Sequence, residues 1–316
     1  MQAQPQSYAT INYRGDTTPR PTRNMQSGVR KLPSIIESHD ILRGTRGTYE
    51  IEKEVGSGGM AEVYLGRHTD SNWPVAIKVA KAAAHDNFIE REYNALASVK
   101  HENVVSVYDG GFVDGRKFIV MEYLEGKDLY TYIHAAMVDR PDAPVEPDAA
   151  VAITLQVLAA LEAVHKAQLV HADVKPTNVF LAESQDSTKV KILDFGLSST
   201  FSECAKSSAI FGTPGFMAPE QAAGRPFSPK SDIYAVGVLL YTMLTGQEPF
   251  SGSDSQIVEQ TISSYPPPLE AKCDDLPAEL VDTVNKAMEK DPEKRFRDAT
   301  EFREQLERIL FALDSS

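Results

Sequence analysis

Hydrophobic residues follow a strand-like pattern in the first part of the chain. Short apolar runs at residues 63–65, 75–77 and 118–120 predict strands. Residues 87–99, between the second and third run, show the spacing of a helix. The chain up to Gly126 is therefore expected to form a sheet with one main helix.

The pattern becomes helical after Gly126. Residues 149–165 place apolar side chains on one face at the helical period, and a short strand-rich patch follows at residues 170–193. Strands followed by helices predict an α+β, bilobal fold: an antiparallel-sheet N-lobe with one main helix, a mostly helical C-lobe, and a cleft between them. Further helices are predicted at residues 232–244, 278–288 and 299–313.

Residues 1–46 differ from the rest of the chain. They are basic, show little periodicity, and are rich in Gln, Ser, Thr, Pro and Arg. One interpretation is a flexible tail. The alternative is a regulatory segment that folds back on the acidic body, with Ile35 and Ile36 as its anchor. The predicted division is thus a tail (1–46), an N-lobe (47–124) and a C-lobe (125–316).

Composition and charge exclude several classes of function. The 316 residues are 42% hydrophobic and 24% charged, as is usual for a globular protein. A formal net charge of −13 opposes binding to phosphate backbones, so no nucleic-acid partner is expected. The two cysteines, Cys204 and Cys273, exclude a disulfide framework and a zinc-ligand cluster, and they favour a cytoplasmic compartment. No signal peptide and no apolar run of about 18 residues is visible, so any membrane anchor is expected outside this chain.

Two segments of the predicted sheet are candidates for holding phosphates. The loop Gly56-Ser57-Gly58-Gly59 lets backbone N–H groups approach phosphate oxygens without side-chain clash, although a bare hairpin would have the same composition. Because the loop lies between two strands, it differs from a dinucleotide-binding loop, which opens a helix.

Lys78 ends the apolar run Val75-Ala76-Ile77. Its ammonium can pair with phosphates, whereas the alternative is a lysine that faces solvent. Glu92 on the predicted helix is the expected partner that holds Lys78 extended, and Glu90 is the competing choice.

Two further segments carry groups suited to phosphoryl transfer. Residues 171–178 have the sequence HADVKPTN, in which Asp173 can orient an acceptor hydroxyl or take its proton. Lys175 can neutralise charge on the transferring phosphoryl group, and Asn178 offers an amide oxygen to a metal. Asp194, followed by Phe-Gly after a mostly apolar run, is a hard oxygen ligand suited to Mg²⁺.

These segments together resemble, in the right order, the motifs of eukaryotic-type protein kinases, and most of all those of the bacterial receptor-type serine/threonine kinases. The resemblance covers residues 49–313. It includes the glycine loop, the VAIK, HxDxKPxN and DFG motifs, and the segments Gly212-Thr213-Pro214 and Ala218-Pro219-Glu220. Agreement of six motifs in order is far less frequent by chance than agreement of one.

The resemblance implies ATP with Mg²⁺ (or Mn²⁺) as cofactors. The protein substrates would carry serine or threonine and would include the chain itself through autophosphorylation, for which the hydroxyls of the tail are candidates. A homodimer is compatible with it. The catalytic residues would be Asp173, Lys175 and Lys78, and the metal ligands Asn178 and Asp194. Nucleotide contacts would come from Val55, Gly56, Ser57, Gly58, Gly59, Val63, Ala76, Lys78, Met121, Glu122, Leu124, Asp128, Asn178, Phe180 and Asp194.

The family pattern also implies individual roles. Met121 would be the gatekeeper, Glu122 and Leu124 the hinge that pairs with adenine, and Asp128 the ribose contact. Lys175 and Thr213 match the serine/threonine type rather than the tyrosine type. Two structural groups are implied as well: a packed column of Leu96, His171 and Phe195 with its footing at Asp232, and a buried ion pair of Glu220 with Arg295.

Three features depart from the family pattern: Ala61 replaces the third loop glycine, residues 137–147 form a Pro/Asp-rich insertion, and Ala172 stands where many kinases have arginine. That arginine would bind a phosphorylated residue of the activation loop. We therefore hypothesise that activity does not depend on phosphorylation of Ser207 or Ser208. The alternative is that another arginine, such as Arg91, substitutes.

Two rival functions differ from a protein kinase in what they require. A pseudokinase that serves as a scaffold or binding module would be expected to lack Lys78, Asp173 or Asp194, and all three are present. A small-molecule kinase of related fold would lack the Ala-Pro-Glu segment that is present here.

Overall fold

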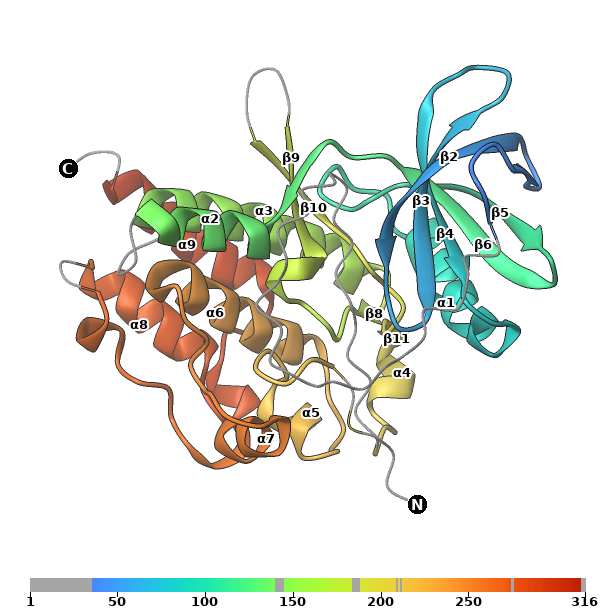
Figure 1. Ribbon diagram of the computed structural model, residues 1–316. Helices are drawn as coiled ribbons and strands as arrows, with labels where there is room; N and C mark the ends of the chain where they lie inside the picture. The colour runs from blue at the N-terminus through green and yellow to red at the C-terminus, as the bar shows by residue number, and fades with distance from the viewer. Residues whose placement is uncertain are drawn as a thin grey trace. The chain divides into compact units, whose positions relative to one another are not determined.

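A six-stranded antiparallel sheet is the frame of the first of two units into which the chain divides (Figure 1). The computed structural model describes residues 36–139, 145–183, 188–208, 210, 212–273 and 276–313. The first unit contains residues up to 89 together with 107–126. The second contains residues 90–106 and those from 127 onward.

The strands of the first unit follow the spatial order β1-β2-β3-β4-β6-β5, and each neighbouring pair is antiparallel. Short connections join β2 to β3, β3 to β4 and β5 to β6, as antiparallel hairpins require. After β4, a 3₁₀ turn at Ala83–His85 leads into helix α1 (Asp86–Ser98). The strands are β1 (Ile41–Arg43), β2 (Thr48–Ser57), β3 (Ala61–His68), β4 (Pro74–Ala80), β5 (Val107–Val113) and β6 (Arg116–Glu122).

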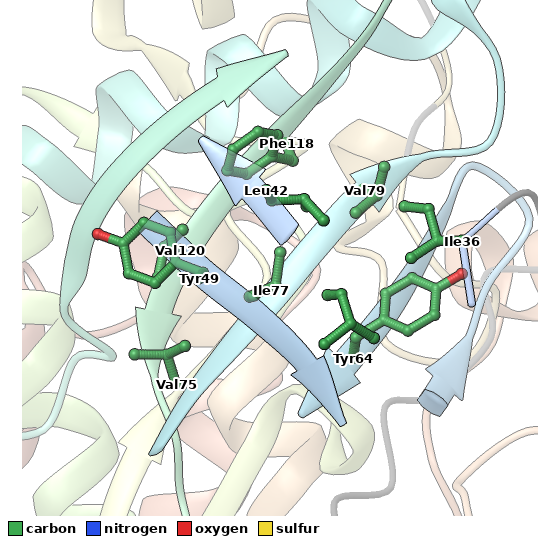
Figure 2. Packing of buried hydrophobic residues seen from close by; sticks show 10 residues of the cluster. Ile36, Leu42, Tyr49, Tyr64, Val75, Ile77, Val79, Phe118 and Val120 are labelled. Carbon is green, nitrogen blue, oxygen red and sulfur yellow. The ribbon is translucent and has the colours of Figure 1, made fainter. Parts of the chain in front are cut away.

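Alternation of side chains along the strands gives this sheet two different faces. Figure 2 shows the apolar face, where Ile77 and Val79 of β4 pack with Phe118 and Val120 of β6 beneath Leu42. The residues between them point the other way. The apolar face therefore builds the core of the unit, and the opposite face carries Lys78 together with Val63, Ala76 and Met121.

The last part of the predicted tail has more order than its sequence pattern indicated. Ile36 is buried in the apolar core, and residues 41–43 form β1 against β2 (Figure 2). The carboxylate of Asp109 on β5 holds the loop after β1, because it accepts hydrogen bonds from the backbone N of Thr45 (3.0 Å) and of Arg46 (2.9 Å). A three-residue strand carries too little alternation to be recognised from sequence. Ile35, the other predicted anchor, lies outside the described residues.

Helices dominate the second unit. Its helices are α2 (Leu129–Asp139), α3 (Pro147–Lys166), α4 (Phe201–Cys204), α5 (Pro219–Ala222), α6 (Pro229–Thr245), α7 (Asp254–Ser263), α8 (Ala278–Ala287) and α9 (Ala299–Leu313). Short 3₁₀ turns lie at Pro176–Asn178, Leu269–Ala271 and Pro292–Lys294. Its strands are β7 (Gly126–Asp128), which begins at the unit boundary, β8 (Leu169–Val170), β9 (Val179–Glu183), β10 (Thr188–Ile192) and β11 (Ser199–Thr200).

Helix α6 lies at the centre of the second unit, and every residue from Ser231 to Thr245 is buried. It packs against α3 and α8, and α3 packs against α9 (Figure 1). By length and composition alone, α3 is apolar enough to cross a membrane. Its apolar residues, Val157 and Leu161 among them, are instead buried inside the unit, which is typical of a core helix.

The predicted α+β class is confirmed: an antiparallel N-terminal sheet with one main helix precedes a mostly helical part. The five long helices predicted from periodicity occur as α1, α3, α6, α8 and α9. The predicted cap of α9 is present too, since Asp298 Oδ1 accepts a hydrogen bond from the backbone N of Glu301 at 2.8 Å. The four-residue helices α4 and α5 were not predicted, because one turn shows no period. Within the predicted insertion, residues 140–144 lie outside the described residues.

Candidate active site

The predicted catalytic segment, residues 171–178, links β8 to β9 in the second unit. It is an irregular loop that ends in the 3₁₀ turn Pro176–Asn178, where proline suits the first position because its missing N–H has no helical partner. Asp173, Lys175 and Asn178 are each 5% exposed. A loop this buried must pair its polar groups internally, and it does so around Asp173.

Three side chains meet at the carboxylate of Asp173. Lys175 Nζ lies 2.7 Å from Asp173 Oδ2, and the hydroxyl of Thr213 donates to Asp173 Oδ1 at 2.7 Å. Lys175 Nζ also donates to Thr213 Oγ1 at 2.7 Å, which closes a ring of three contacts. Asn178 Nδ2 donates to Asp173 Oδ2 at 3.2 Å. The carboxylate is thereby fixed in direction and paired with a cation.

Asn178 and Asp194 fit the predicted metal site in the chemistry of their oxygens. Asn178 directs its amide nitrogen to Asp173, so its amide oxygen is left as an acceptor, and within the described residues no donor reaches that oxygen. The backbone N of Leu193 donates to the carbonyl oxygen of Asn178 at 2.8 Å, which holds the residue before Asp194 beside Asn178.

Asp194 has a positive φ of 60°, a conformation that turns its carboxylate out of the strand direction. Across the described part of the chain, no group of three or more His, Cys, Asp or Glu side chains is arranged for metal binding. A site for Mg²⁺ usually has only one or two protein oxygen ligands, and water and phosphate oxygens complete the coordination. Asn178 and Asp194 would be two such ligands.

Buried Asp232, at the start of α6, binds the backbone at the beginning of the catalytic loop. Its two carboxylate oxygens accept hydrogen bonds from the backbone N of His171 (2.9 Å) and of Ala172 (2.9 Å), and Oδ2 also contacts His165 Nε2 at 2.8 Å. The His171 ring lies edge-on to Phe195 with centroids 4.7 Å apart. Asp232 is therefore the footing that the family resemblance implied.

The predicted ion pair of Glu220 and Arg295 is confirmed. The guanidinium donates to both carboxylate oxygens at 2.8 Å, and Ser231 adds a hydrogen bond of 2.6 Å. Burial raises the pKa of Glu220, but the contacts with Arg295 and Ser231 outweigh it and hold that pKa below its ordinary value. The pair stays ionised at neutral pH and anchors the Ala-Pro-Glu segment to the helical core.

In the first unit, the glycine-rich segment is the turn between β2 and β3. Gly56 pairs with Val63 across the hairpin, and the backbone N of Gly58 donates to the carbonyl of Ala61 at 2.8 Å. Gly56 and Ser57 belong to β2, and Gly58 and Gly59 form the turn. The position between two strands agrees with the sequence prediction and differs from a loop that opens a helix.

Four of the predicted nucleotide-contacting side chains share the face of the sheet opposite the apolar core of Figure 2. Val63 lies opposite Lys78, and Ala76 lies opposite Met121, so their side chains project from the same side of the strands. The Lys78 side chain is 4% exposed, and its ammonium lies 5.3 Å from the ring centre of Phe88. A solvent-facing lysine, the alternative interpretation, is excluded by this burial.

Burial also separates the two candidate partners of Lys78 on α1. Glu92 is 1% exposed, whereas Glu90 is exposed, so Glu92 is the better candidate for an internal ion pair. The contact itself stays a prediction.

The remaining predicted residues occupy defined positions. Glu122 ends β6, Leu124 follows it in the connection to β7, and Phe180 is buried on β9. Asp128 is 1% exposed, and its Oδ1 accepts a hydrogen bond of 2.6 Å from the backbone N of Thr131, which caps the start of α2. The cap gives Oδ1 of Asp128 a structural role, and the ribose contact stays a prediction. An aspartate before a helical run is a signal from which the cap could have been predicted.

The sequence analysis missed two residues that support the catalytic loop. Gln221 Nε2 donates to the carbonyl oxygen of Ala172 at 3.0 Å, from the residue after Glu220. Cys204 is fully buried in an apolar cluster with Val170, Ala172 and Phe227. Neither contact has a sequence signal, because glutamine and cysteine occur in many structural positions.

Comparison with known proteins identifies the family to which this arrangement corresponds. Residues 49–306 match the protein kinase domain. Serine/threonine-protein kinase Pkn1 of Myxococcus xanthus is 34% identical over 288 residues, which cover 87% of this chain and 40% of that protein. Serine/threonine-protein kinase PknB of Mycobacterium tuberculosis is 34% identical over 275 residues (83% and 42%), and PrkC of Bacillus subtilis is 35% identical over 269 (82% and 40%). The matched region thus spans about two fifths of the length of these relatives.

Proposed function

This chain belongs to the protein kinase family, and we propose that it transfers the terminal phosphoryl group of ATP to serine and threonine hydroxyls of proteins. Family membership implies ATP as the donor. The observation that carries the proposal is the ring of contacts among Asp173, Lys175 and Thr213, each of 2.7 Å. A threonine in this ring and a lysine two residues after the aspartate support serine and threonine over tyrosine as acceptors.

Asp173 is proposed to align the acceptor hydroxyl and to receive its proton. Lys175 and Thr213 fix the orientation of the carboxylate, and Asn178 donates a further hydrogen bond to Oδ2. Because Lys175 carries a positive charge at the point where the phosphoryl group passes, it stabilises the charge of that group in the transition state. Positioning and electrostatics are what phosphoryl transfer requires from a protein.

Asn178 and Asp194 would hold Mg²⁺ or Mn²⁺ through one amide and one carboxylate oxygen. When bound, the metal neutralises phosphate charge and orients the transferring group. The residues fit this task because Asn178 keeps its amide oxygen as an acceptor and Asp194 supplies a hard anionic ligand.

The face of the first sheet that carries Lys78, opposite the apolar core, is proposed to receive the nucleotide. Val63, Ala76 and Met121 form an apolar surface for the adenine, and Lys78 on the same face is placed for the α- and β-phosphates. The turn would cover the phosphates, with the backbone N–H of Gly59 as a donor, because the N–H of Gly58 is bonded to the carbonyl of Ala61. In the hinge, the backbones of Glu122 and Leu124 would pair with the adenine edge.

Partners and location follow from the same activity. Protein substrates are implied by the family, and we propose that the chain also phosphorylates itself, on hydroxyls of residues 1–46 above all. We propose a site of action in the cytoplasm, where ATP is available and both cysteines stay reduced. A pseudokinase scaffold is less well supported, because Lys78, Asp173 and Asp194 are all present in the sequence and buried groups pair around Asp173.

The test is incubation of the purified chain with γ-labelled ATP and a library of basic serine- and threonine-containing peptides. We expect label on serine and threonine, dependence on Mg²⁺ or Mn²⁺, and loss of transfer in Lys78→Met. Asp282→Asn, an exposed change on α8, is the matched surface control and should behave as the wild type. Binding of ATP without any transfer to peptides or to the chain would support the scaffold function instead.

A further inference from the structure

The side chain of Ala172 lies in a small apolar cluster next to the catalytic aspartate. The buried members are Val170, Ala172, Cys204 and Phe227, and Phe201 packs against them. Ala172 has a φ of 67°, so the chain turns sharply here and sends the side chain of Asp173 into the polar ring described above. In place of a guanidinium, this position offers a methyl group, and the cluster carries no charge.

Cys204 and Phe227 come from segments distant from the catalytic loop. Cys204 ends α4, the short helix of the activation segment (residues 197–212, after the Asp-Phe-Gly motif), and Phe227 lies between α5 and α6. The backbone N of Phe227 donates to the carbonyl oxygen of Cys204 at 3.3 Å. The catalytic loop, α4 and the segment before α6 therefore meet in one apolar cluster.

Backbone contacts hold α4 in the same place. Strand β11 pairs antiparallel with β8, with Ser199 opposite Val170, and the backbone N of Phe201 donates to the carbonyl of Gln168 at 3.1 Å. A capping box formed by Thr200 and Glu203 closes the first turn. Strand pairing, a backbone hydrogen bond and a helix cap thus order residues 199–204.

The thiol of Cys204 acts here as an apolar group. Burial, with the nearby carboxylates of Asp232 and Glu203, raises its pKa to about 12, so it remains a neutral thiol at every physiological pH. It is fully buried, and its only polar contact in the described structure is a long one of 3.8 Å to the carbonyl of Ser199. A buried neutral thiol packs as a small hydrophobic side chain.

Arg91, the alternative cation for a loop phosphate, already acts on a carboxylate. Hydrogen bonds from Thr200 lower the pKa of Glu203, and the attraction of Arg91 lowers it further. Glu203 belongs to α4, so the arginine on α1 attracts a permanent negative charge of the same helix.

We propose that Cys204 and Phe227 are positioning residues for phosphoryl transfer, which hold the activation segment against Ala172 by apolar packing in place of an arginine–phosphate contact. The inference rests on the proposed kinase activity. It assigns to each residue a role exerted through its neighbours: Cys204 sets the position of α4, Phe227 sets that of the segment before α6, and both support the turn at Ala172 that presents Asp173.

The first experiment compares Cys204→Ser with Cys273→Ser. Cys273 is also buried, and its thiol contacts a backbone carbonyl at 3.1 Å, so it controls for the general cost of exchanging sulfur for oxygen. We expect Cys204→Ser to lower kcat for peptide by about tenfold, a barrier change that one misplaced contact can produce, while KM for ATP changes by less than about twofold. Cys204→Val, which keeps the site apolar, should restore kcat to within about threefold of the wild type. Equal kcat in both serine variants would overturn the proposal.

The second experiment tests independence from phosphate. Wild type and Ser207→Ala/Ser208→Ala are treated with phosphatase, and initial rates of peptide phosphorylation are measured before and after incubation with ATP. We expect the rates to agree within about twofold, because packing rather than phosphate orders the segment. A wild type that gains about tenfold during incubation, with a double mutant that does not, would overturn the proposal.

A third measurement separates this inference from the proposed function. Hydrogen exchange at the amides of Phe201, Ala205 and Phe227 reports the order of the segment whether or not the protein transfers phosphate. Cys204→Ser should accelerate exchange at these amides, and Cys273→Ser should not. An inactive wild type would contradict the kinase function alone, whereas unchanged exchange in Cys204→Ser would contradict the positioning role alone.

Discussion

Ala172 and Asp173 are neighbours in the chain, yet their side chains lie in opposite surroundings. Asp173 is enclosed by Lys175, Thr213 and Asn178, each within hydrogen-bonding distance. Ala172 is enclosed by carbon and sulfur. The polar cluster orients the charged groups proposed to act in the reaction. The apolar cluster holds the backbone in place without charged contacts. The positive φ of Ala172 turns the backbone so that the two neighbouring side chains enter different clusters.

The difference shows how a kinase-type loop can be held in two ways. A charged contact such as arginine with phosphate is strong and directional, and it is present only after modification. An apolar contact is present as soon as the chain folds, because it depends on burial alone. The second kind therefore suits an enzyme whose switch lies outside the activation segment.

Loss of the metal site should lower the rate of phosphoryl transfer more than the changes at Glu220, Thr213 and Ala172 described below. Asp194→Asn removes the only anionic ligand of the proposed pair, and we expect kcat to fall by about 10² to 10³-fold, the range for loss of one electrostatic stabiliser. Chelation by EDTA should abolish transfer in the wild type, and added Mg²⁺ should restore it. Transfer that persists in EDTA would exclude the metal role of Asp194 and Asn178.

Glu220→Gln should have the next largest effect, on stability rather than on chemistry. Removing one charge of a buried pair leaves Arg295 uncompensated, at a cost of about 3 to 5 kcal/mol in the free energy of unfolding. The measurement is urea unfolding at pH 7, with Glu293→Gln, an exposed partner of Lys230, as the matched control. Equal midpoints for the two variants would contradict the structural role of the pair.

The same pair predicts a pH dependence. The folded-state pKa of Glu220 lies below its ordinary value, so its contribution to stability is complete above the unfolded-state pKa and is lost as the pH falls through the folded-state pKa. Wild type should therefore lose stability on acidification more steeply than Glu220→Gln. Parallel curves of unfolding free energy against pH would show that Glu220 has no depressed pKa.

Thr213→Val tests the ring around Asp173 at nearly constant volume. Loss of the hydroxyl removes one partner from both Asp173 and Lys175, and we expect kcat to fall by about tenfold to a hundredfold with little change in KM for ATP. Thr213→Ser keeps the hydroxyl and should retain most of the rate. Equal losses in the two variants would contradict the account, because the hydroxyl would then be no more important than the methyl group.

Ala172→Gly should have the smallest effect, because two terms oppose each other. Glycine relieves the positive φ by about 1 kcal/mol, and loss of one buried methyl costs about 0.8 kcal/mol. Ala172→Val, whose branched side chain fits poorly at φ 67°, should instead destabilise the protein by about 2 kcal/mol. Thermal unfolding of both variants measures the pair of effects. A stabilised valine variant would show that the turn is not strained.

Some parts of the site could be predicted from sequence and others could not, for physical reasons. Asp173, Lys175 and Asn178 stand within six residues, so local spacing carries their chemistry, and the positions of Val63, Ala76 and Lys78 follow from strand alternation. The cluster of Ala172, Cys204 and Phe227 joins residues far apart in the chain, and apolar side chains there look like any other core. Asp109 was missed for the same reason, since its partners near Thr45 lie in a segment with no periodicity.

The central claim is that Asp173 performs phosphoryl transfer while the surrounding structure stays intact without it. Single-turnover transfer from Mg²⁺–ATP to peptide, measured for wild type and Asp173→Asn alongside ATP binding and thermal unfolding, tests it directly. We predict that Asp173→Asn lowers the transfer rate by about 10² to 10⁴-fold, as expected for a lost general base, while nucleotide binding stays close to that of the wild type. A variant that transfers phosphate at near the wild-type rate would contradict the account.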